Sequence, residues 1–174
     1  MVHPHKQNHN NAQRPPRPTL ARRTLHVLRN DVVGGLECST LELARYLHTH
    51  GIPQSVVFLS NPATPSISDR FRSHGISVRR VEYNRASPLI FLRSLLRTLR
   101  EMRPEVVFVQ GALGLHAPVA MLARLAGASR VWTFVVMRPA THGVSRAVQY
   151  AMTHLARPFS DGEICVAQYL ADFL

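Results

Sequence analysis

The sequence predicts an α/β protein with a doubly wound, parallel, Rossmann-like sheet. From Thr24 onward, short runs rich in β-branched residues alternate with amphipathic helical patterns, which is typical of repeated βα units. The runs that follow Glu105 and Arg130 are almost continuously apolar, as expected for parallel strands covered on both faces. Because crossovers between parallel strands are right-handed, we expect helices on both faces of one open sheet.

Six strands are expected, and the segments between them are long enough for helical crossovers. The strands span Thr24–Arg29, Ser55–Leu59, Ile76–Val81, Glu105–Val109, Arg130–Val136 and Glu163–Val166. In a chain of 174 residues that is 45% hydrophobic, these strands supply one good core rather than two. We therefore expect a single folded domain over residues 24–174.

The first helix is predicted from an apolar face that starts just after a pair of glycines. Leu36, Leu43, Ala44 and Leu47 are expected to be buried on this face, and Gly51 is expected to end the helix.

The helix that begins at Ser87 and Pro88 has the clearest pattern in the chain. A capping residue is followed there by proline at the first helical position. Arg93, Arg97 and Arg100 are expected on its outer face. Its buried stripe is expected to comprise Leu89, Leu92, Leu95, Leu96, Leu99 and Met102. Further helices are expected over 117–126 and 144–156, and a last one from about Tyr169.

Residues 1–23 are predicted to form a disordered basic arm. Pro15, Pro16 and Pro18 prevent a helix there, and the segment has too few apolar residues to order itself. The arm carries five of the charges behind the formal net charge of +11, with no acid among them. Histidines clustered in a disordered tail are usually solvent-exposed polar residues without a specific ligand. We therefore expect no metal site, and the rest of the sequence gives no reason to expect a cofactor.

The two cysteines and the N-terminus favour a cytoplasmic location. Cys38 and Cys165 are too few and too far apart to form a metal motif or a disulfide framework. The N-terminus lacks the apolar stretch of a signal peptide, and arginine interrupts each apolar run before it reaches membrane-spanning length.

Gly34 and Gly35 lie between the first strand and the first helix, where α/β proteins bind anions. Glycine lets the backbone pass close to a ligand, and a helix start offers unpaired N–H groups and a positive dipole end. Glu37 lies in the first turn of the same helix. These residues predict a site for phosphate or for an acceptor group.

A second turn, at Gln110 and Gly111, follows the fourth expected strand. Ligands of open α/β sheets gather outside the carboxyl ends of the strands, so both glycine turns should lie at the same edge. His116 follows this second turn and is expected at the same edge, either as a binding residue or simply as a residue that starts a helix.

The order of elements, together with several short sequence stretches, resembles the amino-terminal domain of family-four glycosyltransferases. These are retaining enzymes built from two facing Rossmann-like domains, the GT-B architecture. The matching stretches are Leu25–Glu37 (LHVLRNDVVGGLE), Leu43–Gly51 (LARYLHTHG), Arg103–Gly111 (RPEVVFVQG), Leu122–Val131 (LARLAGASRV) and Ile164–Leu174 (ICVAQYLADFL). They cover nearly everything after the arm.

The resemblance implies that the loop of Gly34 and Gly35 comes close to the phosphates of a nucleotide sugar and to the acceptor. It also implies transfer of a hexosyl group to a hydroxyl acceptor with retention at the anomeric carbon, without a metal. Two family histidines are replaced, one by Gln110 and the other, most often tied to catalysis, by Phe134 and its neighbour. His142 lies a few residues later and is the candidate catalytic residue, with a cap or surface role as the alternative.

The resemblance also implies a second domain, because the chain stops at Leu174, where the family's linker to its donor-binding domain begins. We therefore expect the isolated chain to be inactive and to need a carboxy-terminal transferase domain in trans. The alternative is a non-catalytic binding or scaffolding remnant of a split or truncated transferase.

The sequence also bears on three other classes of function: nucleic-acid binding, membrane contact and dinucleotide-dependent dehydrogenation. The sequence pI of about 11.3 allows nonspecific, salt-sensitive adsorption to nucleic acid, but no nucleic-acid recognition motif appears. The arginine stripe at 93, 97 and 100 suits either solvent or peripheral contact with anionic lipid headgroups at the inner membrane face. A dinucleotide dehydrogenase is disfavoured, because the first turn lacks the spaced three-glycine fingerprint.

Overall fold

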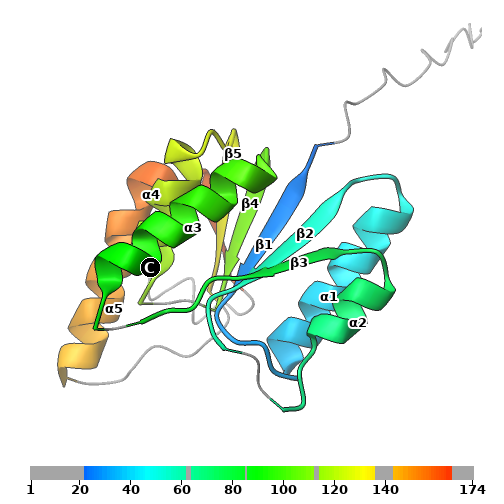
Figure 1. Ribbon diagram of the computed structural model, residues 1–174. Helices are drawn as coiled ribbons and strands as arrows, with labels where there is room; N and C mark the ends of the chain where they lie inside the picture. The colour runs from blue at the N-terminus through cyan, green and yellow to red at the C-terminus, as the bar shows by residue number, and fades with distance from the viewer. Residues whose placement is uncertain (1–21, 62–63, 85, 112–113, 136–142, 166–174) are drawn as a thin grey trace, which may run out of the picture.

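The computed structural model describes residues 22–61, 64–84, 86–111, 114–135 and 143–165. Its strands form one parallel sheet in the order β3-β2-β1-β4-β5-β6 (Figure 1). The strands are β1 (Thr24–Leu28), β2 (Gln54–Phe58), β3 (Ser77–Arg80), β4 (Val106–Gln110), β5 (Arg130–Val135) and β6 (Gly162–Cys165). The order reverses between β1 and β4, which is where an open α/β sheet binds its ligands.

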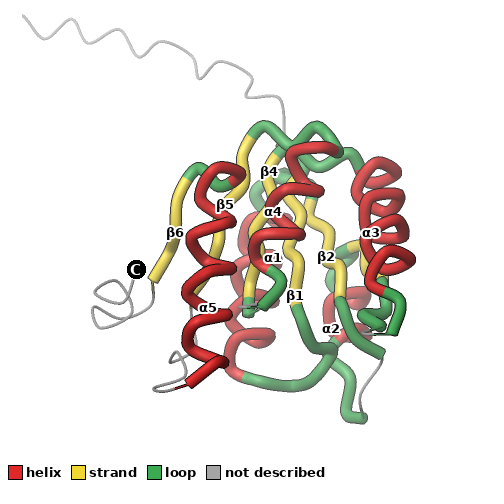
Figure 2. The backbone as a smooth tube through the Cα atoms, turned by 90° about the vertical axis from the view of Figure 1, so that its left-hand side faces the viewer, coloured by secondary structure: helices red, strands yellow, loops and turns green. Residues whose placement is uncertain are grey.

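The helices cover both faces of the sheet, which confirms the doubly wound prediction. One face carries α1 (Gly35–Thr49) and α2 (Ser68–Ser73). The other face carries α3 (Pro88–Met102), α4 (His116–Leu125) and α5 (Gly143–Ala156), which lie side by side in front of the sheet in Figure 2. A short 3-10 helix, η1 (Arg157–Phe159), joins α5 to β6.

Two hydrophobic clusters, one on each face, hold the layers together. The alternation of side chains along β1 places Leu28 on the α1 side and Val27 on the α3 side. On the α1 side, Val56 and Phe58 pack with Leu41 of the helix. The larger cluster, on the α3 side, includes Leu25, Val57, Val107, Val109 and Val131 from the strands and Phe91, Leu95, Leu99, Val119 and Leu122 from the helices.

The structure corrects two of the predicted helix faces. On α1, Leu41 is buried, whereas Leu43 is 37% exposed. On α3, Leu89 is 78% exposed, and Phe91 takes the buried place instead. The i, i+4, i+8 spacing of Phe91, Leu95 and Leu99 sets the buried face, and Leu89 lies too far round the helix to join it.

The helix starts and strand ends agree with the sequence to within a residue or two. α3 begins at Pro88 as predicted, although the side chain of Ser87 makes no capping hydrogen bond. Arg23 lies at the end of the predicted arm, and its carbonyl accepts hydrogen bonds from the backbone N–H groups of Glu105 and Val106. Residues 1–21, Val136, Val166 and the helix expected near Tyr169 lie outside the described residues. Among the helices of the described part, none is long and apolar enough to cross a membrane.

Candidate functional site

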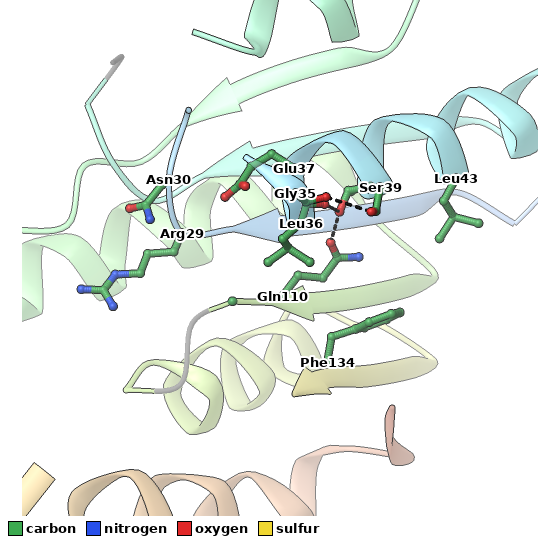
Figure 3. Close-up of a pocket in the computed structure, with 11 residues that line it drawn as sticks. Arg29, Asn30, Gly35, Leu36, Glu37, Ser39, Leu43, Gln110 and Phe134 are labelled. Carbon is green, nitrogen blue, oxygen red and sulfur yellow. Dashed lines mark hydrogen bonds between the residues drawn. The ribbon is translucent and has the colours of Figure 1, made fainter. Parts of the chain in front are cut away.

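A cavity of about 540 Å³ opens at the carboxyl edge of the sheet, between the ends of β1 and β4. The start of α1 forms one wall, and the ends of β4 and β5 form the other (Figure 3). Its described lining consists of Arg29, Asn30, Gly35, Leu36, Glu37, Ser39, Thr40, Leu43, Gln110, Gly111 and Phe134. The structure therefore brings both predicted glycine turns to one cavity, at the point where the strand order reverses.

The start of α1 leaves backbone donors facing this cavity. Gly34 is the N-cap and, as a glycine, has no side chain that could cap the helix. Its carbonyl accepts the first helical hydrogen bond from the backbone N–H of Cys38 at 2.9 Å. The N–H groups of the first turn therefore have no partner within the helix. Gly35 is exposed, and a Cβ placed on it would meet no atom within 4 Å. A ligand can thus approach the backbone at Gly35.

Gly34 serves a different purpose, because it leaves room for the side chain of Glu37. A Cβ at Gly34 would lie 2.5 Å from Oε2 of Glu37. Glu37 is only 8% exposed, and its carboxylate points away from Gln110, on the side of Asn30 (Figure 3). A carboxylate in the first turn is stabilised by the positive end of the helix. A phosphate bound here would meet this negative charge as well as the helix amides.

Gln110 forms the floor of the cavity and is held by a buried chain of polar contacts. Its Oε1 accepts a hydrogen bond from Oγ1 of Thr40 on α1, and its Nε2 lies 3.2 Å from Nδ1 of His26. Nε2 of His26 lies 2.9 Å from Oε1 of Gln54. Burial lowers the pKa of His26 to about 4, so the ring is neutral, with its hydrogen on Nε2 and Nδ1 accepting from Gln110.

Apolar side chains line the cavity on both walls. Leu36 and Leu43 point from α1 toward the strand ends that carry Gln110 and Phe134 (Figure 3). Phe134 packs edge-on against Phe108 with ring centroids 5.5 Å apart. The sequence patterns missed Leu43, Thr40 and Phe134 as lining residues. The apolar pattern of the helix predicts Leu43 on its buried face, and no local pattern marks these three residues as lining.

Gly111 shapes the cavity through its backbone conformation. Its φ of +66° is one that glycine adopts readily, and a Cβ there would lie 2.7 Å from Cδ2 of Leu36. The positive φ therefore favours glycine at the turn after β4, and a Cβ there would also displace the side chain of Leu36.

The two candidate histidines do not join the described lining. His116 begins α4 and is fully buried, and neither ring nitrogen has a hydrogen-bond partner among the described residues. Burial lowers its pKa to about 4. His142, the candidate catalytic residue, lies outside the described residues.

Asp31, which sequence reasoning did not select, fixes the loop that follows β1. Its buried carboxylate accepts hydrogen bonds from the hydroxyls of Ser66 and Ser68, from the backbone N–H groups at the start of α2, and from Arg80. Burial raises the pKa of this carboxyl, and the hydrogen bonds from Ser68, Arg80 and Ser66 outweigh that effect and lower it. The carboxylate thus anchors the loop after β1 to α2 and β3. Arg29 and Asn30, at the cavity rim, belong to this loop.

The open parallel sheet, with its ligand cavity at the strand-order reversal, defines a Rossmann-like domain of the GT-B type. The chain belongs to the Glycosyl transferase 4-like domain family, whose sequence profile matches residues 34–172. No curated protein matches the chain.

Several solved structures share the fold. A HepE structure from Anabaena in complex with UDP and glucose matches with a TM-score of 0.68 and 13% identity, over 87% of this chain and 40% of that one. A glycosyltransferase from Rickettsia africae matches with a TM-score of 0.57 and 15% identity, over 84% of this chain and 43% of that one.

A UDP-N-acetylglucosamine 2-epimerase matches with a TM-score of 0.56 and 12% identity, over 87% of this chain and 43% of that one. The chain therefore spans less than half the length of these structures. At such identities the likeness concerns the fold, and enzymes of different reaction types share it.

Proposed function

We propose that this chain forms the acceptor-side half of a retaining glycosyltransferase that moves a hexosyl group from a nucleotide sugar to a hydroxyl acceptor. The observation that carries the proposal is the meeting of Gly35, Gln110 and Gly111 around one cavity at the strand-order reversal. The family membership and the UDP and glucose in the HepE structure support it.

In this proposal the chain positions the acceptor and stabilises charge on the departing diphosphate. The unpaired N–H groups at the start of α1 would donate to that diphosphate at the moment of transfer. Exposed Ser39 lies beside the apolar side chains of Leu36 and Leu43. This arrangement suits an acceptor whose hydroxyl group is attached to an apolar body.

A donor-binding domain acting together with this chain is part of the same proposal, as is a cytoplasmic location at the inner membrane face. The cavity is partly open to solvent, so a second domain could cover it. We therefore expect the chain alone to show little or no turnover of a nucleotide sugar.

The test is to measure sugar transfer by the chain alone and by the chain mixed with a GT-B donor-binding domain. Transfer is expected only in the mixture and should be lost with Gly35→Val, which fills the cavity without a clash in the fold. Ala151→Val, on the exposed side of α5, adds similar bulk elsewhere and should leave transfer unchanged. Turnover by the chain alone that is lost with Gly35→Val would contradict the need for a second domain.

The second candidate function is a non-catalytic module that binds an acceptor or scaffolds a partner. The buried Glu37 carboxylate at the expected phosphate turn favours it, because this charge opposes phosphate binding. Acceptor binding that is weakened by Gly35→Val, together with no transfer in any mixture, would support this function over the first.

A further inference from the structure

The outward face of α3 combines two features that the sheet and the cavity do not explain. Leu89 and Ile90 are 78% and 67% exposed, the highest values for large hydrophobic side chains in the described part of the chain. They are adjacent residues in the first turn of a helix whose opposite side is well packed. Such apolar exposure costs free energy in water unless another surface covers it.

Three arginines lie on the same outward face as this apolar pair. Arg93 is three residues from Ile90 and four from Leu89, and Arg97 and Arg100 continue the face along the helix. All three, with Arg103, line a groove of about 650 Å³.

The positive charge of this face is largely uncompensated. Arg97 pairs with Glu101 at 2.9 Å, whereas Arg93 and Arg100 form no ion pair with any residue of the described part. Elsewhere in that part, exposed Arg45 and Arg72 are each paired with an acid on the same helix. The α3 face is thus an unneutralised positive surface beside an apolar patch.

We infer that the outward face of α3, defined by Leu89, Ile90, Arg93, Arg97 and Arg100, docks on an anionic lipid bilayer. In an interfacial helix, apolar side chains enter the boundary between headgroups and acyl chains while arginines contact the anionic headgroups. The aliphatic pair decides between lipid and nucleic acid, because a nucleic-acid backbone gains little from contact with leucine and isoleucine.

The apolar pair lies at the same edge of the sheet as the cavity, although α1, which walls the cavity, covers the other face. α3 begins just after the loop that follows β3, so Leu89 and Ile90 lie toward the carboxyl edge of the sheet, where the cavity opens. This inference goes beyond the proposed transfer reaction and names the surface that would hold the chain against an amphiphilic acceptor.

Vesicle flotation of the full chain tests the inference without any nucleotide sugar. Vesicles of phosphatidylcholine alone are compared with vesicles that also contain phosphatidylglycerol, at low and high salt. Binding is expected only to the anionic vesicles and should weaken as salt screens the charges. Equal recovery with neutral and anionic vesicles, or no recovery with either, would overturn the inference.

Two double variants and one matched double control show whether the α3 face is the surface that binds vesicles. Arg93→Gln with Arg100→Gln should lower partitioning about thirtyfold, since each arginine near such a membrane contributes about 1 kcal/mol. Arg45→Gln with Arg72→Gln removes the same charge from the opposite side of the sheet and should change partitioning little. An equal loss in the two pairs would show that only net charge matters and would overturn the inference.

Leu89→Ser with Ile90→Ser separates lipid from other polyanions. This pair should weaken vesicle binding at both salt concentrations and leave binding to RNA unchanged. Vesicle binding that is untouched by the pair would overturn the docking mode. Because these side chains are exposed, the urea midpoint of each variant should match that of the parent chain, which separates docking from folding. A failed docking test leaves the proposed sugar transfer untouched.

Discussion

Nε2 of Gln110 lies 3.2 Å from Nδ1 of His26, beneath the floor of the cavity. Both side chains are buried, at 1% and 0% exposure, and each has a further partner, Thr40 for Gln110 and Gln54 for His26. This contact joins the end of β4 to the middle of β1. The amide that forms the cavity floor is therefore held in one orientation by the core.

Replacing Gln110 with leucine should destabilise the fold. The substitution leaves Nδ1 of His26 without its donor, and a buried unpaired polar group costs about 1–3 kcal/mol. The hydroxyl of Thr40 loses Gln110 but keeps the carbonyl of Leu36 as its acceptor. Urea denaturation measures the change in the free energy of unfolding. Gln110→Leu and His26→Leu combined should cost less than the sum of the single changes, and additive costs would contradict the contact.

Replacing Glu37 with glutamine should strengthen binding of a nucleoside diphosphate at the α1 start. The change keeps the size of the side chain and removes the negative charge that opposes a phosphate there, which corresponds to about a two- to fivefold gain in affinity. Calorimetric titration with UDP measures it. Glu42→Gln, an exposed carboxylate on the same helix, is the control, and an equal gain there would point to net charge instead.

Alanine substitutions should separate the glycines that shape the fold from the glycine that faces the ligand. Gly111→Ala should cost about 1–3 kcal/mol, because its positive φ and the closeness of Leu36 both oppose a Cβ. Gly35→Ala should change stability by less than about 0.5 kcal/mol. Thermal unfolding of the two variants measures the difference, and similar losses in both would contradict it.

Stability should fall as the pH is lowered from about 6.5 to about 4. Burial lowers the pKa values of His26 and His116 to about 4, while both titrate near 6.5 in the unfolded chain. The unfolded state therefore binds more protons in this window, and each histidine costs on the order of 3 kcal/mol of stability by its lower end. Urea midpoints measured across this range test the slope.

The His116→Leu variant should show a shallower pH dependence and should be at least as stable as the parent at neutral pH. An imidazole whose nitrogens have no partner in the described part gives up nothing when an apolar side chain replaces it. An unchanged slope in this variant would show that His116 does not titrate as its burial indicates.

Asp31→Asn should be among the most destabilising single changes in the described part. It removes the charge that Arg80 pairs with and weakens the acceptor for Ser66 and Ser68, with an expected cost of about 3 kcal/mol. Asp69→Asn removes an exposed carboxylate from an i,i+3 pair and should cost less than about 0.5 kcal/mol. Chemical denaturation compares the two variants, and equal costs would contradict the anchoring role of Asp31.

The sheet was predictable because most of its strands contain a short apolar run bounded by breakers, although β3 itself reads Ser-Val-Arg-Arg and is largely exposed. β4 and β5 are rich in apolar residues, which made their places evident, although of their described apolar residues only those on the α3 side, such as Val107, Val109 and Val131, are fully buried. The strand-order reversal followed from right-handed crossovers. Periodicity was weaker at helix ends, where Leu89 fits an apolar pattern by type and yet has no neighbour to pack against.

Four of the residues that the sequence picked out line the cavity, namely Gly35, Glu37, Gln110 and Gly111. Gly35 and Gly111 line the cavity as the turns indicated, because glycines at strand ends report close approach or positive φ. Phe134 and Leu43 line it through contacts between elements distant in sequence, which no local pattern encodes. The opposing charge of Glu37 was likewise hidden, because its direction depends on how the side chain folds back over Gly34.

The hydrogen-bonded side chains of Thr40, Gln110, His26 and Gln54 run diagonally across the α1 face of the sheet. Gln110 ends β4 at one rim, whereas Gln54 begins β2 at the other rim and donates there to the carbonyl of Ile52. An occupant that pulls the Gln110 amide out of place would also disturb the imidazole behind it and, through that ring, the start of β2. A change in the nuclear magnetic resonance shift of the Gln54 side-chain amide would therefore report binding in the cavity, although Gln54 does not line it.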